Sequence, residues 1–231
     1  MTWWPLALYE QSPVLLVSWI FWVIASITLH ELAHGWTAIR HGDDTPILTG
    51  HMTVNPIVHM GPMSLVAFAL LGFAWGAMPI DPTRLRGRHA EAMVAGAGPV
   101  MNVGLAGICV LCSCLVLRYL PPLGVSFDIA QRLHLFFFAG GMLNGVLALF
   151  NLAPIPPLDG SRIAAAYSRR YVDFAQSSLG QGVLFIAMAL MFFTSGRVLF
   201  PMAARVFFEC ASAVDSLLPS LPTPARQGPT P

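Results

Sequence analysis

Residues 30–34 read His30-Glu31-Leu32-Ala33-His34 and lie inside an apolar run that extends from Val14 to Ile39. A run of this length is typical of a helix that crosses a membrane. Two histidines four positions apart share one face of a helix, so both imidazoles can bind one metal ion. Because ionisable groups at membrane depth are costly, their presence here indicates a functional site. The stretch therefore predicts a membrane helix that carries two zinc ligands, with Glu31 placed to take a proton from a water on the zinc.

The composition of the chain is also that of a membrane protein. Of its 231 residues, 56% are hydrophobic and 10% are charged, whereas a soluble domain has about 25% charged residues. The mean hydropathy is +0.68 and the formal net charge is +1. This balance argues against nucleic acid as a partner and predicts a lipid bilayer as the surrounding medium.

Several stretches are long and apolar enough to span a bilayer. They are Val14–Ile39, Ala92–Tyr119, Leu133–Leu152 and Leu179–Phe200. A fifth stretch, Met63–Ile80, is borderline because it is short and contains glycines and a closing proline. The expected fold is an all-α polytopic membrane protein with four full transmembrane helices and one re-entrant or short fifth segment.

The apolar stretches also divide the chain into parts. Residues 1–13 are expected to form an extracytoplasmic N-terminal segment, and residues 14–200 the membrane domain that carries the histidine motif. Residues 201–218 are expected to form an amphipathic C-terminal helix, and the Pro-rich residues 219–231 a disordered tail.

The arginines predict the orientation of the chain in the membrane. Arginines cluster within residues 84–88 and within residues 162–170, and Arg40 closes the first span. The positive-inside rule places all of these on the cytoplasmic side and the N-terminus outside. If residues 63–80 crossed completely, Arg40 and residues 84–88 would lie on opposite sides, so a re-entrant course is expected. The predicted location is the cell inner (plasma) membrane, with several passes and the histidine motif near the cytoplasmic side.

A catalytic zinc site generally has three protein ligands and one position open to water. Asp159 is the candidate for the third ligand, because it follows a proline-rich break at the inner end of the third full span. If residues 63–80 do not cross, Asp159 comes to the same end of the membrane as His30 and His34. The residues alone leave open that Asp159 caps the helix that follows it.

Together with these motifs, further blocks of the sequence resemble the site-2 protease family of intramembrane zinc metalloproteases, in its compact bacterial type without a PDZ or CBS domain. The blocks are Gly50–Pro62, Phe73–Pro82, Ala97–Asn102 and Asn151–Gly160, with Asn144 ahead of the last one. They follow the order of the family from about Ser18 to Tyr167. One departure is Ala77-Met78, which stands where the family commonly has a Lys-Pro pair.

The resemblance implies that His30, His34 and Asp159 bind one zinc ion per chain and that Glu31 is the catalytic acid and base. It also implies a small membrane-associated β-hairpin over residues 50–62. The predicted function is that of an intramembrane zinc endopeptidase, which hydrolyses peptide bonds within or near transmembrane segments. Transmembrane helices of membrane-protein substrates are the expected partners.

Asn102, Asn144 and Asn151 are amides in otherwise apolar stretches. They are candidates for binding the substrate or the oxyanion, and the alternative is that they form hydrogen bonds between helices. Two other functions are considered: an ion- or metal-handling membrane transporter, and a family member that binds helices without cleaving them. The clustering of ionisable residues at one end disfavours the transporter, and the presence of Glu31 disfavours the inactive form.

Overall fold

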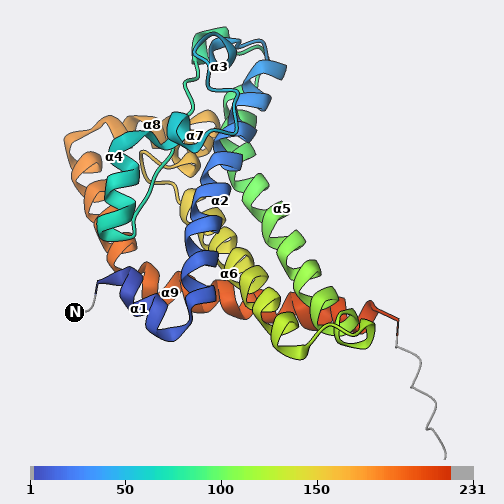
Figure 1. Ribbon diagram of the computed structural model, residues 1–231. Coiled ribbons are helices and arrows are strands. Elements are labelled where there is room, and N and C mark those ends of the chain that lie inside the picture. Colours follow the sequence, from blue (N-terminus) through green and yellow to red (C-terminus); the bar gives the residue numbers. More distant parts are fainter. Residues whose placement is uncertain (1–2, 220–231) are drawn as a thin grey trace, which may run out of the picture.

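The computed structural model describes residues 3–219 and shows a bundle of helices (Figure 1). The helices that are long and apolar enough to cross a membrane are α2 (Pro13–Arg40), α5 (Ala90–Tyr119), α6 (Phe127–Asn151) and α9 (Ser178–Leu217). The shorter ones are α1 (Trp4–Gln11), α3 (Thr45–Leu48), α4 (Pro56–Leu71), α7 (Asp159–Tyr167) and α8 (Arg169–Gln176), with single 3-10 turns at Pro82–Arg84 and Pro121–Leu123. The prediction of four helices able to span a membrane is confirmed. Apart from Pro219, the expected disordered tail lies outside the described residues.

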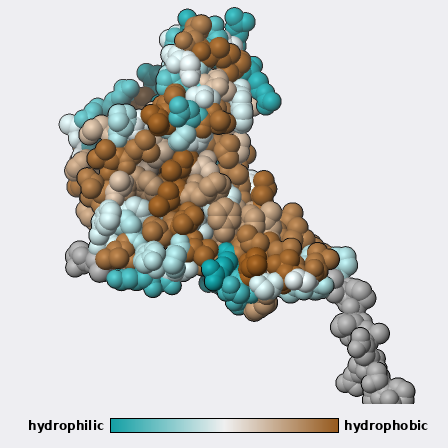
Figure 2. All heavy atoms as spheres, in the orientation of Figure 1, coloured by the Kyte–Doolittle hydropathy of each residue, from teal (hydrophilic) through white to brown (hydrophobic). Residues whose placement is uncertain are grey.

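The surface of the molecule is hydrophobic around its middle and more hydrophilic at its upper and lower ends (Figure 2). Many large apolar side chains of the membrane-type helices are exposed, among them Val100 of α5 at 70% and Phe193 of α9 at 79%. Such an exposed band would be unfavourable in water and is suited to contact with lipid tails.

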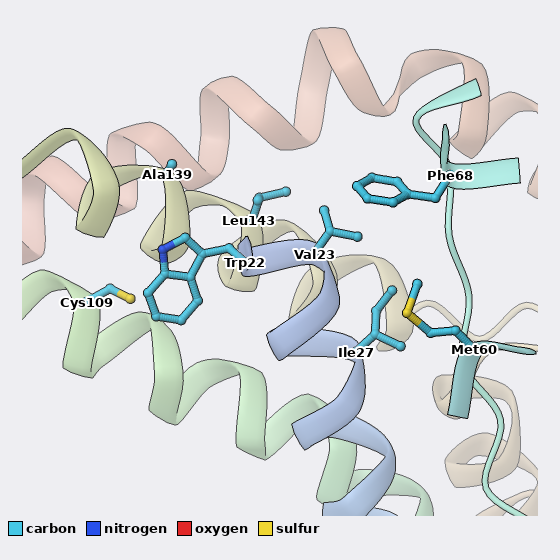
Figure 3. Packing of buried hydrophobic residues seen from close by; sticks show 8 residues of the cluster. All are labelled: Trp22, Val23, Ile27, Met60, Phe68, Cys109, Ala139 and Leu143. Atoms are coloured by element: carbon cyan, nitrogen blue, oxygen red, sulfur yellow. The ribbon is translucent and has the colours of Figure 1, made fainter. Parts of the chain in front are cut away.

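Helices α2, α5 and α6 pack together at the centre of the bundle. Trp22 of α2 packs against Gly140 of α6, where a Cβ atom would come within 2.3 Å of the indole ring. The indole Nε1 donates a hydrogen bond to the carbonyl oxygen of Phe136, at 2.8 Å. Figure 3 shows this apolar cluster extending from Cys109 of α5 to Phe68 of α4. The packing fixes the position of α2, and with it the position of the histidine motif.

The chain that follows α4 turns back along it. Gly72 ends α4 with a φ of 73°, a backbone conformation that favours glycine. The hydroxyl of Ser64 then accepts a hydrogen bond from the backbone nitrogen of Trp75 (2.8 Å) and donates one to its carbonyl oxygen (2.7 Å). The backbone nitrogen of Ala77 donates to the carbonyl oxygen of His59, at 2.9 Å. The short fifth segment therefore enters and leaves at the same end of the bundle.

The β-hairpin expected over residues 50–62 is wrong, because no strand occurs between residues 3 and 219. Pro56 is the first residue of α4, and the side chain of Asn55 accepts a hydrogen bond from the backbone nitrogen of Ile57, at 3.0 Å. An asparagine followed by proline is a favourable start for a helix. This local signal leaves only Gly50–Asn55 as a loop, which is too short to form two paired strands.

Helix α9 extends beyond the predicted span Leu179–Phe200 and continues through Pro201 to Leu217. In Figure 1 its first part descends on the side of α4, and its second part runs beneath α6 and α5. Phe207 fits against Gly141 of α6, where a Cβ atom would come within 2.5 Å of the ring. Arg118 of α5 forms an ion pair of 2.8 Å with Asp215. The residues predicted as a separate amphipathic helix thus form the second part of α9 and cover the lower ends of α5 and α6.

Candidate metal centre

The side chains of His30, His34 and Asp159 converge at one place. The two histidine Nε2 atoms are 3.0 Å apart. The Asp159 carboxylate lies 3.1 Å from Nε2 of His30 through Oδ2 and 3.3 Å from Nε2 of His34 through Oδ1. Both histidines are buried, and the three ligand atoms all lie within 4.8 Å of one another. Two nitrogens and one carboxylate oxygen at such distances can hold a single metal ion.

The break between α6 and α7 brings Asp159 to this place. Helix α6 ends at Asn151, and Asp159 is the first residue of α7. Gly160 packs directly on the intervening loop, because a Cβ atom there would lie 2.2 Å from the carbonyl oxygen of Leu152 and 2.5 Å from that of Ala153. No other residue fits this contact without a shift of the backbone. The close approach of the loop to the start of α7 turns the carboxylate toward α2.

The hydrogen bond of His34 determines which of its ring nitrogens can bind a metal. Nδ1 of His34 lies 2.7 Å from the carbonyl oxygen of Val94 in α5. A carbonyl oxygen can only accept, so Nδ1 carries the proton and Nε2 presents a lone pair. Metal-binding histidines in proteins are commonly held by a hydrogen bond of this kind.

Zinc fits the donor atoms at this centre. The side chain of Asp159 is a carboxylate held against the Nε2 atoms of the two histidines. Its Oδ2 atom is buried and has no hydrogen-bond partner among residues 3–219. A buried acceptor without a donor is costly, and a cation would satisfy it. Two imidazole nitrogens and one carboxylate form a ligand set typical of catalytic zinc, which keeps a further position open for water.

Gly98 of α5 forms one wall of the centre. A Cβ atom at this position would lie 2.4 Å from Nε2 of His34 and 2.5 Å from Nε2 of His30. Because glycine has no Cβ atom, the space next to both nitrogens stays open. Any larger side chain would enter the space in which the ligand atoms converge.

Glu31 lies on another face of α2, against the extended segment that follows α4. A Cβ atom on Gly76 would be 2.6 Å from Oε1 of Glu31. One turn further along α2, Gly35 is in similarly close contact with Met52 and Met78. Residues 73–80 therefore run along the Glu31 face of α2, while α5 covers the face of the two histidines.

The predicted asparagines occupy two different environments. Asn102 and Asn144 are fully buried and are joined by a hydrogen bond of 2.8 Å, and Oδ1 of Asn102 lies 2.6 Å from Nδ1 of His30. Asn151 instead donates to the carbonyl oxygen of Leu147 in its own helix, at 3.0 Å. A role for any of the three in binding the substrate or the oxyanion stays a prediction.

Some residues around the centre were not singled out from the sequence. Gly76 and Gly98 belong to family-like blocks, but their contacts depend on how helices meet in space. His59, which also lies in a family-like block, is buried in the structure. Its Nε2 atom donates to the carbonyl oxygen of Thr53 at 2.6 Å, and its Nδ1 atom has no partner in the described part of the chain.

Comparison with known proteins finds similarity to zinc metalloproteases. Residues 118–194 match the family model described as Peptidase family M50. A Bacillus subtilis protein, provisionally named zinc metalloprotease YwhC, is 42% identical over 144 residues, which cover 61% of this chain and 64% of the relative. Proteins provisionally named zinc metalloprotease Rip2 are 28% identical over 167 residues in Mycolicibacterium smegmatis and over 166 residues in Mycobacterium tuberculosis. These cover 68% of this chain and 58% of the relatives.

The chain thus spans about three fifths of the length of the curated relatives that it matches. No solved structure matches it. The resemblance found in the motifs is nevertheless confirmed by both the family model and the relatives. These matches support the assignment of the chain to the site-2 protease family, peptidase family M50.

Proposed function

We propose that this protein is an intramembrane zinc endopeptidase that hydrolyses peptide bonds within or near transmembrane segments of membrane proteins. The observation that carries the proposal is the convergence of His30, His34 and Asp159 in a membrane-type helix bundle, with Glu31 next to the first ligand. This constellation is typical of zinc peptidases in which a glutamate acts as the general base.

In this proposal His30, His34 and Asp159 hold one zinc ion. When bound, zinc supplies a Lewis acid that polarises the scissile carbonyl and lowers the pKa of water. Glu31 takes the proton from the attacking water, whose oxygen forms a bond to the carbonyl carbon. Glu31 then gives the proton to the leaving amide nitrogen as the carbon–nitrogen bond breaks. The products are a new carboxyl group and a new amine.

The position of the centre along α2 supports access for water. His34 lies about 9 Å along the helix axis from Arg40, the last residue of α2. The arginines of residues 84–88 follow the returning segment at this same end. By the positive-inside rule this end is cytoplasmic. We therefore place the N-terminus outside, the protein in the cell inner membrane, and the centre a short distance from cytoplasmic water.

The alternative function as an ion- or metal-handling transporter has less support than the function as a protease. The buried histidines and carboxylates of residues 3–219 are His30, Glu31, His34, Asp43 and His59. All of them belong to the upper half of α2 or to the segments that cover it. An ion pathway needs polar sites through the whole depth of the membrane, and the lower half of α2 provides only hydroxyl and indole N–H groups. This distribution favours a single catalytic centre.

The proposal is tested by cleavage of a panel of single-span model substrates with the purified protein in detergent. The wild type should release product, lose activity when zinc is removed by a chelator, and regain it when zinc is restored. Glu31→Gln removes the base while preserving the size of the side chain. We expect this variant to keep its zinc and to cleave at least about 100-fold more slowly. Equal product from wild type and Glu31→Gln would contradict the proposed mechanism.

A further inference from the structure

We infer that Asn102 and Asn144 are positioning residues, which hold the ring proton of His30 on Nδ1 and so keep its Nε2 lone pair available for the metal. The inference rests on the zinc site proposed above and concerns how the protein prepares one of its ligands. It assigns these buried amides a task in metal binding, in place of contact with the substrate.

The chain of hydrogen bonds starts at a backbone carbonyl in α6. The side-chain nitrogen of Asn144 donates to the carbonyl oxygen of Gly140, at 2.9 Å. Because a carbonyl oxygen has no proton, the NH2 group of Asn144 must face it. The Oδ1 atom of the same amide is then directed to the other side, where it lies 2.8 Å from the side-chain nitrogen of Asn102.

The orientation of the Asn144 amide determines that of Asn102, which in turn determines which ring nitrogen of His30 carries the proton. With its NH2 group donating to Asn144, the amide of Asn102 turns its oxygen toward α2. This oxygen lies 2.6 Å from Nδ1 of His30. It can only accept, so Nδ1 of His30 must carry the proton. Nε2 is then left with a lone pair on the side of His34 and Asp159.

Burial makes the direction of this chain obligatory. Asn102 and Asn144 are both 0% exposed, so solvent cannot supply an alternative partner. If either amide were rotated by 180°, two oxygens or two donors would face each other in a buried place, which is unfavourable. A neutral His30 with its proton on Nε2 would in turn leave two acceptors facing each other at Nδ1.

The ring protons of the two histidines are thus held on Nδ1 by different hydrogen-bond partners. His34 is held directly by the carbonyl oxygen of Val94, which belongs to α5. His30 is held through two side chains, one from α5 and one from α6. Both polar groups of Asn102 are engaged in this arrangement, so its amide is not available to a substrate. The metal affinity should therefore depend on how α5 and α6 are joined at these two amides.

The inference is tested with Asn102→Leu, which removes the acceptor with little change in size. Outer hydrogen-bond partners of metal-binding histidines typically change metal affinity by about 10-fold to 100-fold. We expect zinc affinity, measured by competition with a fluorescent chelator, to fall by at least about 10-fold. In the metal-free protein, NMR of 15N-labelled histidine should show the His30 proton on Nδ1 in wild type and shared between both nitrogens in the variant.

Two further variants separate this task from a general role in packing. Asn102→Asp keeps an acceptor for Nδ1 of His30, so it should restore most of the zinc affinity lost in Asn102→Leu. Ser113→Ala is the matched control, because Ser113 of α5 and His134 of α6 form another hydrogen bond between the same helices, at 2.6 Å. Ser113→Ala should leave zinc affinity unchanged even where it lowers the thermal stability.

The possible outcomes are distinct. Wild-type zinc affinity in Asn102→Leu, or an equal loss in Ser113→Ala, would overturn the inference while leaving the zinc site intact. If Asn102→Leu does not fold, Asn144→Leu tests the same chain of hydrogen bonds one residue further from His30. Without the acceptor on Asn144, the amide group of Asn102 can rotate by 180°. Unchanged zinc affinity and an unchanged position of the His30 proton in that variant would also overturn the inference. Absence of zinc from the wild type would instead refute the proposed function, and the NMR measurement would still decide the position of the proton.

Discussion

Gly98 of α5 lies so close to His30 of α2 that a Cβ atom at position 98 would be 2.5 Å from Nε2 of the histidine. The same atom would be 2.4 Å from Nε2 of His34. Real Cβ atoms do not approach a nitrogen to this distance, so the contact is possible only with glycine. The two helices are in close contact where the metal ligands converge, and the packing of α5 thereby decides how much room the centre has.

This contact predicts that Gly98→Ala loses zinc. The added methyl group would occupy space next to both nitrogens and force the imidazoles apart, so we expect zinc affinity to fall at least about 100-fold, as for a mutation that disrupts ligand geometry. The control is Gly104→Ala in the same helix, where a Cβ atom would meet nothing within 4 Å. Chelator competition on both variants measures the effect, and equal affinities would show that α5 does not limit the centre.

A second glycine predicts a different defect. In Gly76→Ala the new methyl group would lie 2.6 Å from Oε1 of Glu31 and 2.7 Å from Cγ2 of Ile27. Glu31 must move, whereas the metal ligands are not touched. We expect the cleavage rate to fall at least about 10-fold, because a general base has to be within hydrogen-bond reach of its proton, while zinc content stays at the wild-type value. Loss of zinc in this variant would mean that residues 73–80 support the ligands and not the base.

Part of the centre could be predicted from the sequence because it depends on helical periodicity. The spacing of His30 and His34 fixes their common face in any helix. Asp159 could be chosen as the third metal ligand because few carboxylates lie near membrane depth. Its distance from the histidines, however, depends on the loop that packs on Gly160. The sequence showed only that such an approach was plausible.

Other features depend on contacts between distant segments and could not be read from local patterns. The roles of Gly76 and Gly98 follow from what lies opposite them in space. The asparagines were predicted as candidates for binding the substrate or the oxyanion, with hydrogen bonds between helices as the alternative. The order in which Asn144 and Asn102 lead to His30 was not predicted. The β-hairpin was predicted from a resemblance over residues 50–62, and the helix-starting pair Asn55-Pro56 weighed against it locally.

Asp43 predicts a dependence of stability on pH. It is fully buried just after α2, and its carboxylate accepts hydrogen bonds from the backbone nitrogens of Thr45 (3.0 Å) and Asp81 (2.8 Å). Burial acts to raise the pKa of Asp43, but the hydrogen bonds from Thr45 and Asp81 hold it below its ordinary value of 3.8. The pKa is lower in the folded state, so the stabilisation is complete above the ordinary value and is lost as the pH falls through the folded value.

We therefore expect Asp43→Asn to lower the free energy of unfolding by roughly 2 kcal/mol at neutral pH, the size typical of hydrogen bonds to a charged group. The difference from wild type should shrink as the pH falls below 3.8 toward the lower pKa of the folded state. Thermal unfolding of both proteins in detergent at several pH values measures it. A difference that stays constant down to strongly acidic pH would show that the charge of Asp43 is not what holds the loop.

The proposed orientation predicts which loops face the cytoplasm. Thr83, in the arginine-rich loop, and Leu123, between α5 and α6, are both exposed. In a Cys210→Ser background, a membrane-impermeant maleimide should label Leu123→Cys in intact cells and Thr83→Cys only after permeabilisation. This follows from the positive-inside rule. The reverse pattern would place the centre near the outer side of the membrane.

The central claim is that His30, His34 and Asp159 hold one zinc ion, and the metal content of the purified protein tests it most directly. Elemental analysis of wild type, Glu31→Gln and Asp159→Ala should be made on protein prepared in the same way. We predict about one zinc per chain in wild type and in Glu31→Gln, and a large loss in Asp159→Ala, because a site with two histidine ligands lacks the third protein ligand of a catalytic zinc site. Wild-type protein without zinc, or Asp159→Ala with a full complement, would contradict the account.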